Sequence, residues 1–250
     1  MDILFLGVGE ACDERYSNTS LLVKDAGGAT FLLDCGFSVP YLFFAECCDA
    51  DALDAVWLSH FHGDHFFGMP LLLLRLWEMG RTRPLLILGP PGVKEKVVAA
   101  MELAYPNFLP RLAFPLTWLP FAPGHEREIG GCCWSCAENG HSQPSLSLRI
   151  ADGASTLFYS GDGRPTPASA KLAAGCDLIV HEAFWVDEEA EGHGSVIGSI
   201  DFAVQAAARR LALVHLNRKC RRFRRQAIDD LIAAAALPVF LPEPGDMVSL

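Results

Sequence analysis

The sequence predicts an α/β fold in which two β-sheets are flanked by helices. Its first third reads as short strands over residues 2–6, 20–23 and 30–33, which glycines separate from one another. Further along, strands alternate with helices, and neither a repeat period nor a low-complexity linker interrupts the pattern. We therefore expect residues 1–250 to form a single domain.

The remaining elements follow in chain order. A strand over residues 56–59 precedes a helix over residues 64–79, in which apolar residues recur every three or four positions. The segment 105–140 is rich in proline, glycine and aromatic residues, and we expect it to be the least regular. Later strands are predicted at residues 85–88, 145–150, 156–160, 178–181, 211–215, 239–241 and 247–250. Later helices are predicted up to about residue 104 and over residues 168–174, 199–209 and 221–236.

The composition is that of a globular protein. Hydrophobic residues make up 51% of the chain and charged residues 20%, which is enough apolar material for a packed core. No apolar stretch approaches the ~20 residues that a membrane-spanning helix needs, and the N-terminus has no basic leader, so we expect a cytoplasmic protein without a membrane span. The nine cysteines are an odd number and scattered, which favours reduced thiols over a disulfide framework.

The charge of the chain is acidic overall but uneven. A formal net charge of −10 argues against a surface that binds nucleic acid along its whole extent. Between residues 218 and 225, however, six of eight residues are basic. This basic run is either a local site for an anion or a solvated helix face, and the sequence leaves both interpretations open.

The densest group of potential metal ligands lies in residues 59–65, Ser-His-Phe-His-Gly-Asp-His. His60 and His62 alternate and can point the same way, while Asp64 and His65 can face a neighbouring site. The loop follows a buried strand, where side chains can converge on one ion. Satisfied loop histidines are the structural alternative, but this spacing favours two metal sites.

The pattern His-x-His-x-Asp-His resembles the signature of the metallo-β-lactamase fold, a four-layer αββα sandwich of hydrolases. In that fold the later ligands follow strand ends in the order His, Asp, His, and here His141, Asp162 and His215 occur in this order. The resemblance implies that Asp162 bridges two metals, because its two oxygens can span neighbouring cations. The implied ligand sets are His60, His62 and His141 for one metal and Asp64, His65 and His215 for the other.

The chain is most similar to the ribonuclease Z branch of this fold, the tRNA 3′-processing endonucleases. In that branch the histidine at the position of His193 serves as an acid for the leaving group. Two departures weaken a role on tRNA: residues 105–140 lack the long, basic, glycine-rich arm that clamps tRNA, and His215 is followed by Leu-Asn-Arg-Lys-Cys. The matching segments are residues 6–9, 18–20, 33–36, 160–162, 181–183, 192–195 and 213–217.

The resemblance implies hydrolysis by a hydroxide that bridges two divalent metal ions. Such ions lower the pKa of bound water from ~15.7 toward ~7. Zinc is the metal we expect, and manganese or iron would also suit these ligands. Asp64 could hold the proton of the hydroxide, His193 could protonate the departing oxygen, and the basic run could receive a neighbouring phosphate.

We therefore expect a phosphodiesterase that acts on a small phosphodiester, a cyclic nucleotide or a nucleic-acid end. The alternatives are a ribonuclease Z that cleaves precursor tRNA and a cofactor-biosynthesis enzyme of the same fold, such as an iron oxygenase. A binding protein without activity is a further alternative, but none of the ligands has decayed. Relatives are frequently dimers, so a homodimer is possible.

Other residues carry weaker predictions. His125 lies near Glu126 and is expected at the surface, and His181 and Glu182 are expected to support the metal ligands from behind. Asp34 stands at a strand end, where it either orients a metal-binding histidine or is a simple turn residue. A zinc knuckle is disfavoured because no fourth ligand of matching spacing follows the cysteines Cys132, Cys133 and Cys136.

Overall fold

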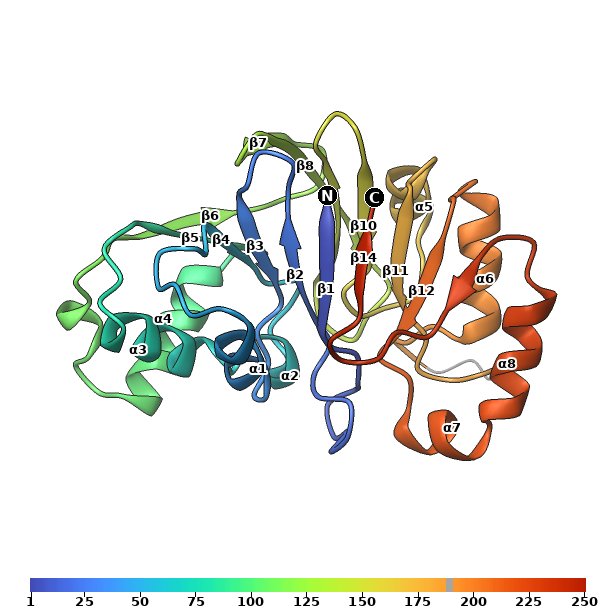
Figure 1. The fold of residues 1–250 in the computed structure, drawn as a ribbon, viewed down its shortest axis with the longest axis horizontal. Coiled ribbons are helices and arrows are strands. Elements are labelled where there is room, and N and C mark those ends of the chain that lie inside the picture. The colour runs from blue at the N-terminus through green and yellow to red at the C-terminus, as the bar shows by residue number, and fades with distance from the viewer. Residues whose placement is uncertain (188–190) are drawn as a thin grey trace.

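The computed structural model describes residues 1–187 and 191–250, and two β-sheets packed face to face dominate it. Helices cover the outer face of each sheet, so the layers run helix, sheet, sheet, helix (Figure 1). Two sheets that each bury both faces need this order, because an apolar sheet face must pack against another layer. The predicted αββα sandwich is confirmed.

The first sheet has the strand order β14-β1-β2-β3-β4-β5-β6. Its β14, β1, β2 and β3 pair antiparallel, whereas the pairs from β3 to β6 are parallel. The parallel strands end at one edge of the sheet, where ligands commonly bind in α/β folds. The strands are β1 (Asp2–Gly7), β2 (Ser20–Lys24), β3 (Thr30–Leu33), β4 (Ala55–Trp57), β5 (Leu85–Gly89), β6 (Leu116–Pro120) and β14 (Met247–Ser249).

The second sheet has the order β13-β12-β11-β10-β9-β8-β7 and a similar division. Strands β10 to β13 pair parallel, and β7 to β10 pair antiparallel. The strands are β7 (Glu126–Ile129), β8 (Cys132–Asn139), β9 (Ser145–Ala151), β10 (Thr156–Tyr159), β11 (Leu178–Glu182), β12 (Leu211–Val214) and β13 (Val239–Phe240).

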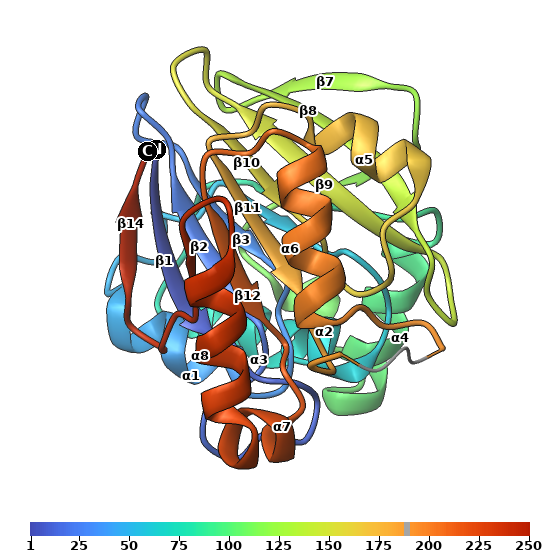
Figure 2. The same cartoon turned by 90° about the vertical axis from the view of Figure 1, so that its right-hand side faces the viewer.

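The helices form two groups (Figures 1 and 2). The helices on the first sheet are α1 (Val39–Glu46), α2 (Gly63–Phe66), α3 (Met69–Glu78) and α4 (Val93–Ala104), and a short 3₁₀ turn, η1 (Leu109–Arg111), follows them. The helices on the second sheet are α5 (Pro167–Ala173), α6 (Val196–Gln205), α7 (Arg218–Phe223) and α8 (Arg225–Ala234).

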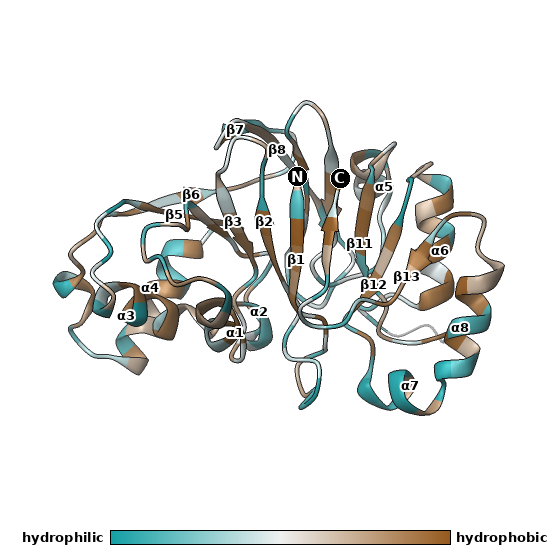
Figure 3. Ribbon diagram, in the orientation of Figure 1, coloured by the Kyte–Doolittle hydropathy of each residue, from teal (hydrophilic) through white to brown (hydrophobic). Residues whose placement is uncertain are grey.

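Three apolar clusters hold these layers together. The central cluster lies between the sheets, where Phe31 packs edge-on against Trp134 with ring centroids 5.0 Å apart. A second cluster joins the first sheet to its helices, and a third joins the second sheet to α6 and α8. The hydrophobic colouring accordingly follows the strands, whereas α7 is hydrophilic (Figure 3).

The predicted strands are found close to their expected bounds, but the helical predictions need corrections. The helix predicted over residues 64–79 is two helices, α2 and α3, because the chain bends at Gly68, where an added Cβ would lie 2.2 Å from the Gly36 carbonyl oxygen. The helix predicted over residues 221–236 is likewise divided into α7 and α8, and α1 was not predicted. No helix in the described part of the chain is long and apolar enough to cross a membrane.

The expectation that residues 105–140 would be the least regular segment is wrong. This segment contains η1, β6, β7 and β8. Along β8 the even-numbered Cys132 and Trp134 are buried while Cys133 is exposed, which is the two-residue alternation of a strand with one face in a core. The proline and glycine residues lie mostly in the turns between short strands, which concealed the strands from a reading based on composition.

Candidate metal centre

The loop that was predicted to bind metal, residues 60–65, follows β4 at the edge where β3, β4 and β5 end. His60 and His65 are fully buried and Asp64 is nearly so. His62 is partly exposed and stands at the N-terminus of α2. The loop therefore presents ligands both inside the protein and toward its surface.

The second sheet supplies the remaining predicted ligands from its own strand ends. His141 lies two residues after β8, Asp162 three residues after β10, and His215 directly after β12. Glu182 is the last residue of β11, between the strands that precede Asp162 and His215. Residues distant in sequence are thereby brought together at one edge of the sandwich.

Backbone hydrogen bonds between the two sheets fix the halves of this site relative to each other. The Leu146 amide donates to the Ser59 carbonyl over 3.0 Å, and the His215 amide donates to the Val8 carbonyl over 2.8 Å. These bonds involve the residue before His60 and a ligand itself. The relative position of ligands from different sheets is therefore set by the backbone.

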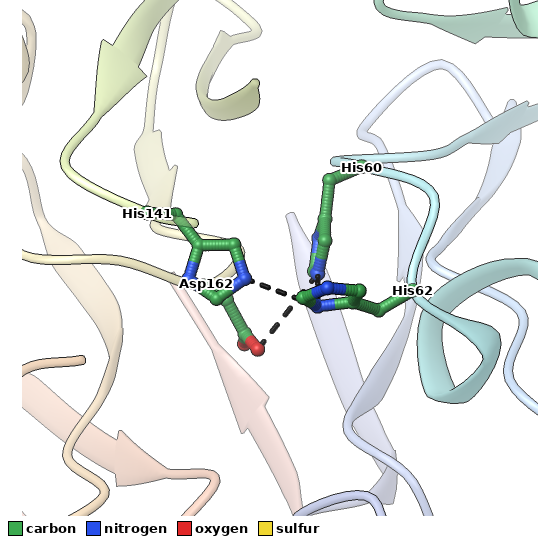
Figure 4. Close-up of side chains that lie close together, drawn as sticks. All are labelled: His60, His62, His141 and Asp162. Atoms are coloured by element: carbon green, nitrogen blue, oxygen red, sulfur yellow. Dashed lines mark hydrogen bonds and ion pairs between the residues drawn. The ribbon is translucent and has the colours of Figure 1, made fainter. Parts of the chain in front are cut away.

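The ligand atoms gather in two groups that share Asp162. Figure 4 shows the first, in which His60 and His62 from the first sheet point toward His141 and Asp162 from the second. Within each group the candidate ligand atoms lie within 4.8 Å of one another. The first group is His60, His62, His141 and Asp162, and the second is Asp64, His65, Asp162 and His215.

The spacing of these atoms fits a metal ion. In the first group, His62 Nδ1 lies 3.1 Å from Nε2 of both His60 and His141. In the second group, Nε2 of His65 and of His215 each lie 3.3 Å from Asp64 Oδ2. Donor atoms about 2.0–2.2 Å from a tetrahedral zinc ion lie about 3.3–3.6 Å apart. The side chains are therefore spaced as the ligands of one ion in each group.

Hydrogen bonds behind the histidines leave their inward nitrogens available. His65 Nδ1 lies 2.7 Å from Asp34 Oδ2, and His141 Nδ1 lies 2.6 Å from the Gly192 carbonyl oxygen. Each acceptor holds the proton on Nδ1, so Nε2 carries the lone pair. His65 Nε2 and Asp162 Oδ1 are buried without a hydrogen-bond partner among residues 1–187 and 191–250. A divalent cation is the group that such atoms fit.

Asp34 is the main support of the second group. Besides His65, its carboxylate accepts hydrogen bonds from the Tyr159 hydroxyl over 2.7 Å and from the Ser59 backbone amide and hydroxyl over 2.7 and 2.8 Å. Asp34 is fully buried. Of the two interpretations left open by the sequence, the structure favours the orientation of a histidine over a simple turn.

Two site residues have an unusual backbone conformation. Asp34 has φ 62° and His215 has φ 56°, in the left-handed region that residues with a Cβ rarely adopt. Both follow a strand, and each turns the chain so that its side chain faces the site. Strained backbone of this kind is concentrated at functional sites.

The electrostatics of the two groups differ. Burial lowers the pKa of His60 well below its usual value, and positive charge on His65 adds to the effect. Burial also lowers the pKa of His65 and of His215, but nearby carboxylates outweigh it: Asp162 and Asp34 raise the pKa of His65 well above its usual value, and Asp162 raises that of His215 to about 9. Because a metal binds the deprotonated ring, binding at these two histidines displaces protons.

His193 lies beside this centre. Its Nδ1 is 3.3 Å from Glu182 Oε1, and Glu182 and His193 form a further cluster with His215. Glu182 is held in place because Oε1 accepts hydrogen bonds from the amides of Gly163 and Gly194 over 3.0 and 2.8 Å. The His193 ring stacks on Phe184, with centroids 4.7 Å apart and planes at 25°.

The weaker predictions have mixed outcomes. Glu182 does lie behind the site, but His181 faces away from the ligand groups: its Nδ1 lies 2.7 Å from the Glu182 carbonyl, and its ring packs against Phe202. His125 is exposed, as predicted. The cysteines of the disfavoured zinc knuckle, Cys132, Cys133 and Cys136, are free thiols, and none of them belongs to a ligand group among the described residues.

Some contributors to the site could not be recognised from the sequence. Tyr159 and Phe184 adjoin recognised motifs but resemble ordinary core aromatics, and Gly192 contributes through its carbonyl oxygen, which no residue pattern reveals. Ser59 precedes the histidine loop directly, and this adjacency was the one signal available for it.

Comparison with known proteins identifies the family. A family model described as "Anti-Pycsar protein Apyc1" matches residues 1–232. The chain belongs to the anti-Pycsar Apyc1 family. The match spans every ligand of the two groups and His193. The resemblance seen in the sequence reached the ribonuclease Z branch and did not name the Apyc1 family.

Members of related families agree with this assignment. A ribonuclease Z of Mycobacterium sp. (strain KMS) is 31% identical and is aligned over 86% of this chain and 84% of its own length. A ribonuclease Z of Methanosarcina acetivorans is 26% identical, with 86% and 87% covered. This Apyc1-family chain is a metallo-β-lactamase-fold, ribonuclease Z-like protein and a metal-dependent hydrolase, as the sequence predicted.

Solved structures show the same fold. The short form of human tRNase Z superimposes with a TM-score of 0.80 at 23% identity, covering 100% of this chain and 99% of that chain. The metallo-β-lactamase-fold protein YhfI from Bacillus subtilis has a TM-score of 0.81 at 20% identity, covering 99% and 98%. The arrangement of the Apyc1-family chain is thus shared along nearly its whole length with proteins of quite different sequence.

Proposed function

We propose that this chain is a phosphodiesterase that uses two divalent metal ions. The observation that carries the proposal is the sharing of Asp162 by two ligand groups beside the pair of Glu182 and His193. His60, His62 and His141 would hold one ion, and Asp64, His65 and His215 the other, with Asp162 between them. When bound, two such ions lower the pKa of water toward ~7 and neutralise charge on phosphoryl oxygens.

The protein's own residues would then do two tasks. Burial raises the pKa of Asp64, but the close approach of His215 and His65, each with Nε2 3.3 Å from Asp64 Oδ2, outweighs it and holds the pKa below its usual value. Asp64 therefore stays ionised and can accept a hydrogen bond from the attacking water. His193 turns Nδ1 toward Glu182, so its Nε2 is the ring atom that can give a proton to the leaving oxygen.

The proposed role of His193 as an acid indicates the class of substrate. A phosphodiester releases an alkoxide, which needs a proton, whereas the centre itself would suit several kinds of hydrolysis. We infer a small phosphodiester, a cyclic nucleotide or a nucleic-acid end as the substrate. Zinc is the ion we expect, with manganese or iron as alternatives, because histidine and carboxylate ligands suit all three.

The proposal is tested by combining metal analysis with hydrolysis assays. We expect two equivalents of metal in the purified protein and hydrolysis of both bis(p-nitrophenyl) phosphate and an alkyl phosphodiester. His193→Ala should lower kcat on the alkyl ester by about 10²–10⁴-fold. It should affect bis(p-nitrophenyl) phosphate far less, because p-nitrophenolate departs without a proton.

The matched control is His125→Ala, which removes an exposed histidine and should alter neither rate. Two bound metals without phosphodiester turnover, in the wild type and in His193→Ala alike, would overturn the proposal. If the His193→Ala variant retains full activity on a substrate that is not a phosphodiester, this would instead favour a cofactor-biosynthesis enzyme or oxygenase. In such an enzyme His193 has no necessary role as an acid.

A ribonuclease Z is the second candidate, and the 31% identity to the mycobacterial ribonuclease Z favours it. Residues 105–140 form strands within the sheets rather than a projecting arm, which argues against a tRNA clamp of the usual kind. Precursor tRNA separates the two candidates, because a ribonuclease Z would cut it near the 3′ end and the phosphodiesterase proposed here would leave it intact.

Three further inferences concern the whole protein. We infer that residues 1–250 act as one domain, supported by the apolar cluster that both sheets contribute to. We also infer a cytoplasmic location and a homodimer. Light scattering coupled to size-exclusion chromatography tests the dimer, since a molar mass near the 27.2 kDa of one chain would contradict it.

A further inference from the structure

A cavity lined by arginines lies beside the metal centre and is separate from it. It has a volume of about 450 Å³ and lies between α7 and the loop that follows β1. No residue of the two ligand groups lines it, although α7 begins three residues after His215. The basic residues on its wall are Arg15, Arg218, Arg221, Arg222 and Arg225.

Arg221 is an unusual member of this wall because it is buried. The residue is 3% exposed, and its guanidinium lies over Tyr16 with Cζ 3.8 Å from the ring centroid. Nη2 donates to the Pro242 carbonyl over 2.7 Å and lies 3.1 Å from Glu243 Oε1. Nε and Nη1 have no hydrogen-bond partner within the described chain. Buried donors are normally paired, so these two lack an acceptor.

The other arginines divide into paired and unpaired side chains. Arg218 forms an ion pair with Glu10, and Arg225 contacts Asp229 over 2.8 Å. Arg15 and Arg222 have no carboxylate partner among the described residues, and each lies over an aromatic ring of an adjacent residue. The cavity therefore retains two guanidinium groups at its wall that form no ion pair with a carboxylate in residues 1–187 and 191–250.

The carboxylates of the cavity do not balance this charge. Asp13 Oδ1 already accepts the amides of Arg15 and Tyr16 over 2.9 and 3.0 Å, and Glu243 faces Arg221. Five guanidinium groups and three carboxylates line the cavity, and two of the arginines, Arg218 and Arg225, form their ion pairs with carboxylates outside the wall. The acidic residues of the wall are Asp13, Glu14 and Glu243. A cavity of this kind concentrates anions locally.

We propose that this cavity is a second anion site, which binds a phosphate group apart from the metal centre. Guanidinium groups match phosphate because their planar donors can form paired hydrogen bonds with its oxygens. Arg15 and Arg222 would contact the phosphate at the wall, and Arg221, held over Tyr16, would add its positive charge from the interior. The basic run predicted from the sequence is therefore neither a uniform solvated face nor a direct extension of the metal site.

Binding is tested with inorganic phosphate and the purified, metal-containing protein. The rise of Tm with phosphate concentration, against sodium chloride of equal ionic strength, gives the apparent Kd. We expect the double variant Arg15→Gln/Arg222→Gln to raise this Kd at least tenfold. The matched control is Arg75→Gln, an exposed arginine of α3 whose loss should leave the Kd unchanged.

Equal phosphate Kd values in the wild type and the double variant would overturn the second site, because all binding would then reside at the metal centre. An absence of any phosphate-dependent rise in Tm would overturn it as well. Neither result bears on the phosphodiesterase proposal, which the hydrolysis of bis(p-nitrophenyl) phosphate by the same preparations reports independently.

The phosphate could belong to the substrate or to a separate ligand, and kinetics distinguish the two sources. This kinetic comparison rests on the proposed function. The KM values of p-nitrophenyl nucleoside phosphodiesters with and without a second, terminal phosphate are compared in each variant. If the substrate supplies the phosphate, the wild type has a lower KM for the phosphorylated ester, and the double variant loses that preference. If the ratio of the two KM values is the same in the wild type and the double variant while the double variant binds phosphate more weakly, the phosphate belongs to a separate ligand.

Discussion

The two ligand groups of the metal centre differ in how deeply they are set into the protein. In the group that contains His65 and His215, every side chain is buried. In the group that contains His62 and His141, these two histidines are partly exposed. We refer to them as the buried group and the open group. Asp162 belongs to both and is the point at which they meet.

The supports behind His65 and His141 differ in the same direction as the burial of these two histidines. Asp34, behind His65, is a fully buried carboxylate that three residues hold by hydrogen bonds. His141 in the open group is held by a single neutral carbonyl, that of Gly192. A fixed anion behind a histidine makes it a stronger ligand. We therefore expect His65 to hold an ion more firmly than His141.

The largest effect on metal binding is expected from Asp162→Ala, because both groups lose the same shared residue. Each group loses a ligand, and the negative charge that opposes the five clustered histidines falls. We expect metal to be lost from both groups, as measured by elemental analysis of the dialysed protein. Asp230→Ala removes an exposed carboxylate on α8 as a control and should retain all metal. Retention of one equivalent by Asp162→Ala would show that the aspartate serves only one group.

The second-largest effect is expected in the free energy of unfolding, where His65→Ala is compared with His62→Ala. Removing His65 leaves the buried Asp34 without its cationic partner, which should lower the free energy of unfolding by about 3 kcal/mol. Removing the partly exposed His62 should lower it by less than about 0.5 kcal/mol. Urea unfolding of chelator-treated protein measures both, and equal losses would remove the distinction between the groups.

A smaller effect is expected from Asp34→Asn, which keeps the shape of the side chain and removes its charge. The amide can no longer accept from His65, Tyr159 and Ser59 together, so metal affinity of the buried group should fall by about 10–100-fold. Competition with a chromogenic chelator measures this affinity. Asp2→Asn is the control, since Asp2 is exposed and its side chain accepts a hydrogen bond from the Ser249 hydroxyl on the C-terminal strand, away from the ligand groups. An unchanged affinity would mean that Asp34 acts only on the backbone turn.

The smallest effect is expected from Tyr159→Phe, which removes one of the hydrogen bonds to Asp34 and leaves the packing between the sheets intact. Its cost to stability should be about 0.5–1.5 kcal/mol. Thermal unfolding of metal-containing protein would detect it as a lowered Tm. A fall in Tm larger than that of Asp34→Asn in the same measurement would contradict the ranking, because it would make the Tyr159 hydroxyl rather than the Asp34 carboxylate the main support.

The residues that gather in the two groups could be predicted as candidate ligands from the sequence, because metal chemistry limits the choice of residue. Histidine and aspartate at fixed spacing have few other uses, so residues 60–65 were recognisable alone, and His141, Asp162 and His215 followed from the order of the resembling fold. The strands were predictable for a similar reason, since their apolar runs end at clear turns.

The residues that hold the candidate ligands in place, and some helix boundaries, could not be predicted because they depend on tertiary contacts. Tyr159 reaches Asp34 across 125 positions of sequence, and nothing local marks either as a partner of the other. The break at Gly68 depends on the close approach of Gly36, which periodicity does not report. The arginine cavity was predicted only as a basic run, since burial of Arg221 against Tyr16 depends on the fold.

The left-handed backbone of Asp34 and His215 has a consequence for protein engineering. Glycine at a position with φ near 60° would relieve about 1 kcal/mol of backbone strain. Asp34→Gly, however, would leave the buried donors of Tyr159 and Ser59 without their acceptor, at about 1–3 kcal/mol for each. A selection for heat resistance alone would therefore keep the strained aspartate, and engineering that replaces left-handed residues by glycine has to leave these two positions unchanged.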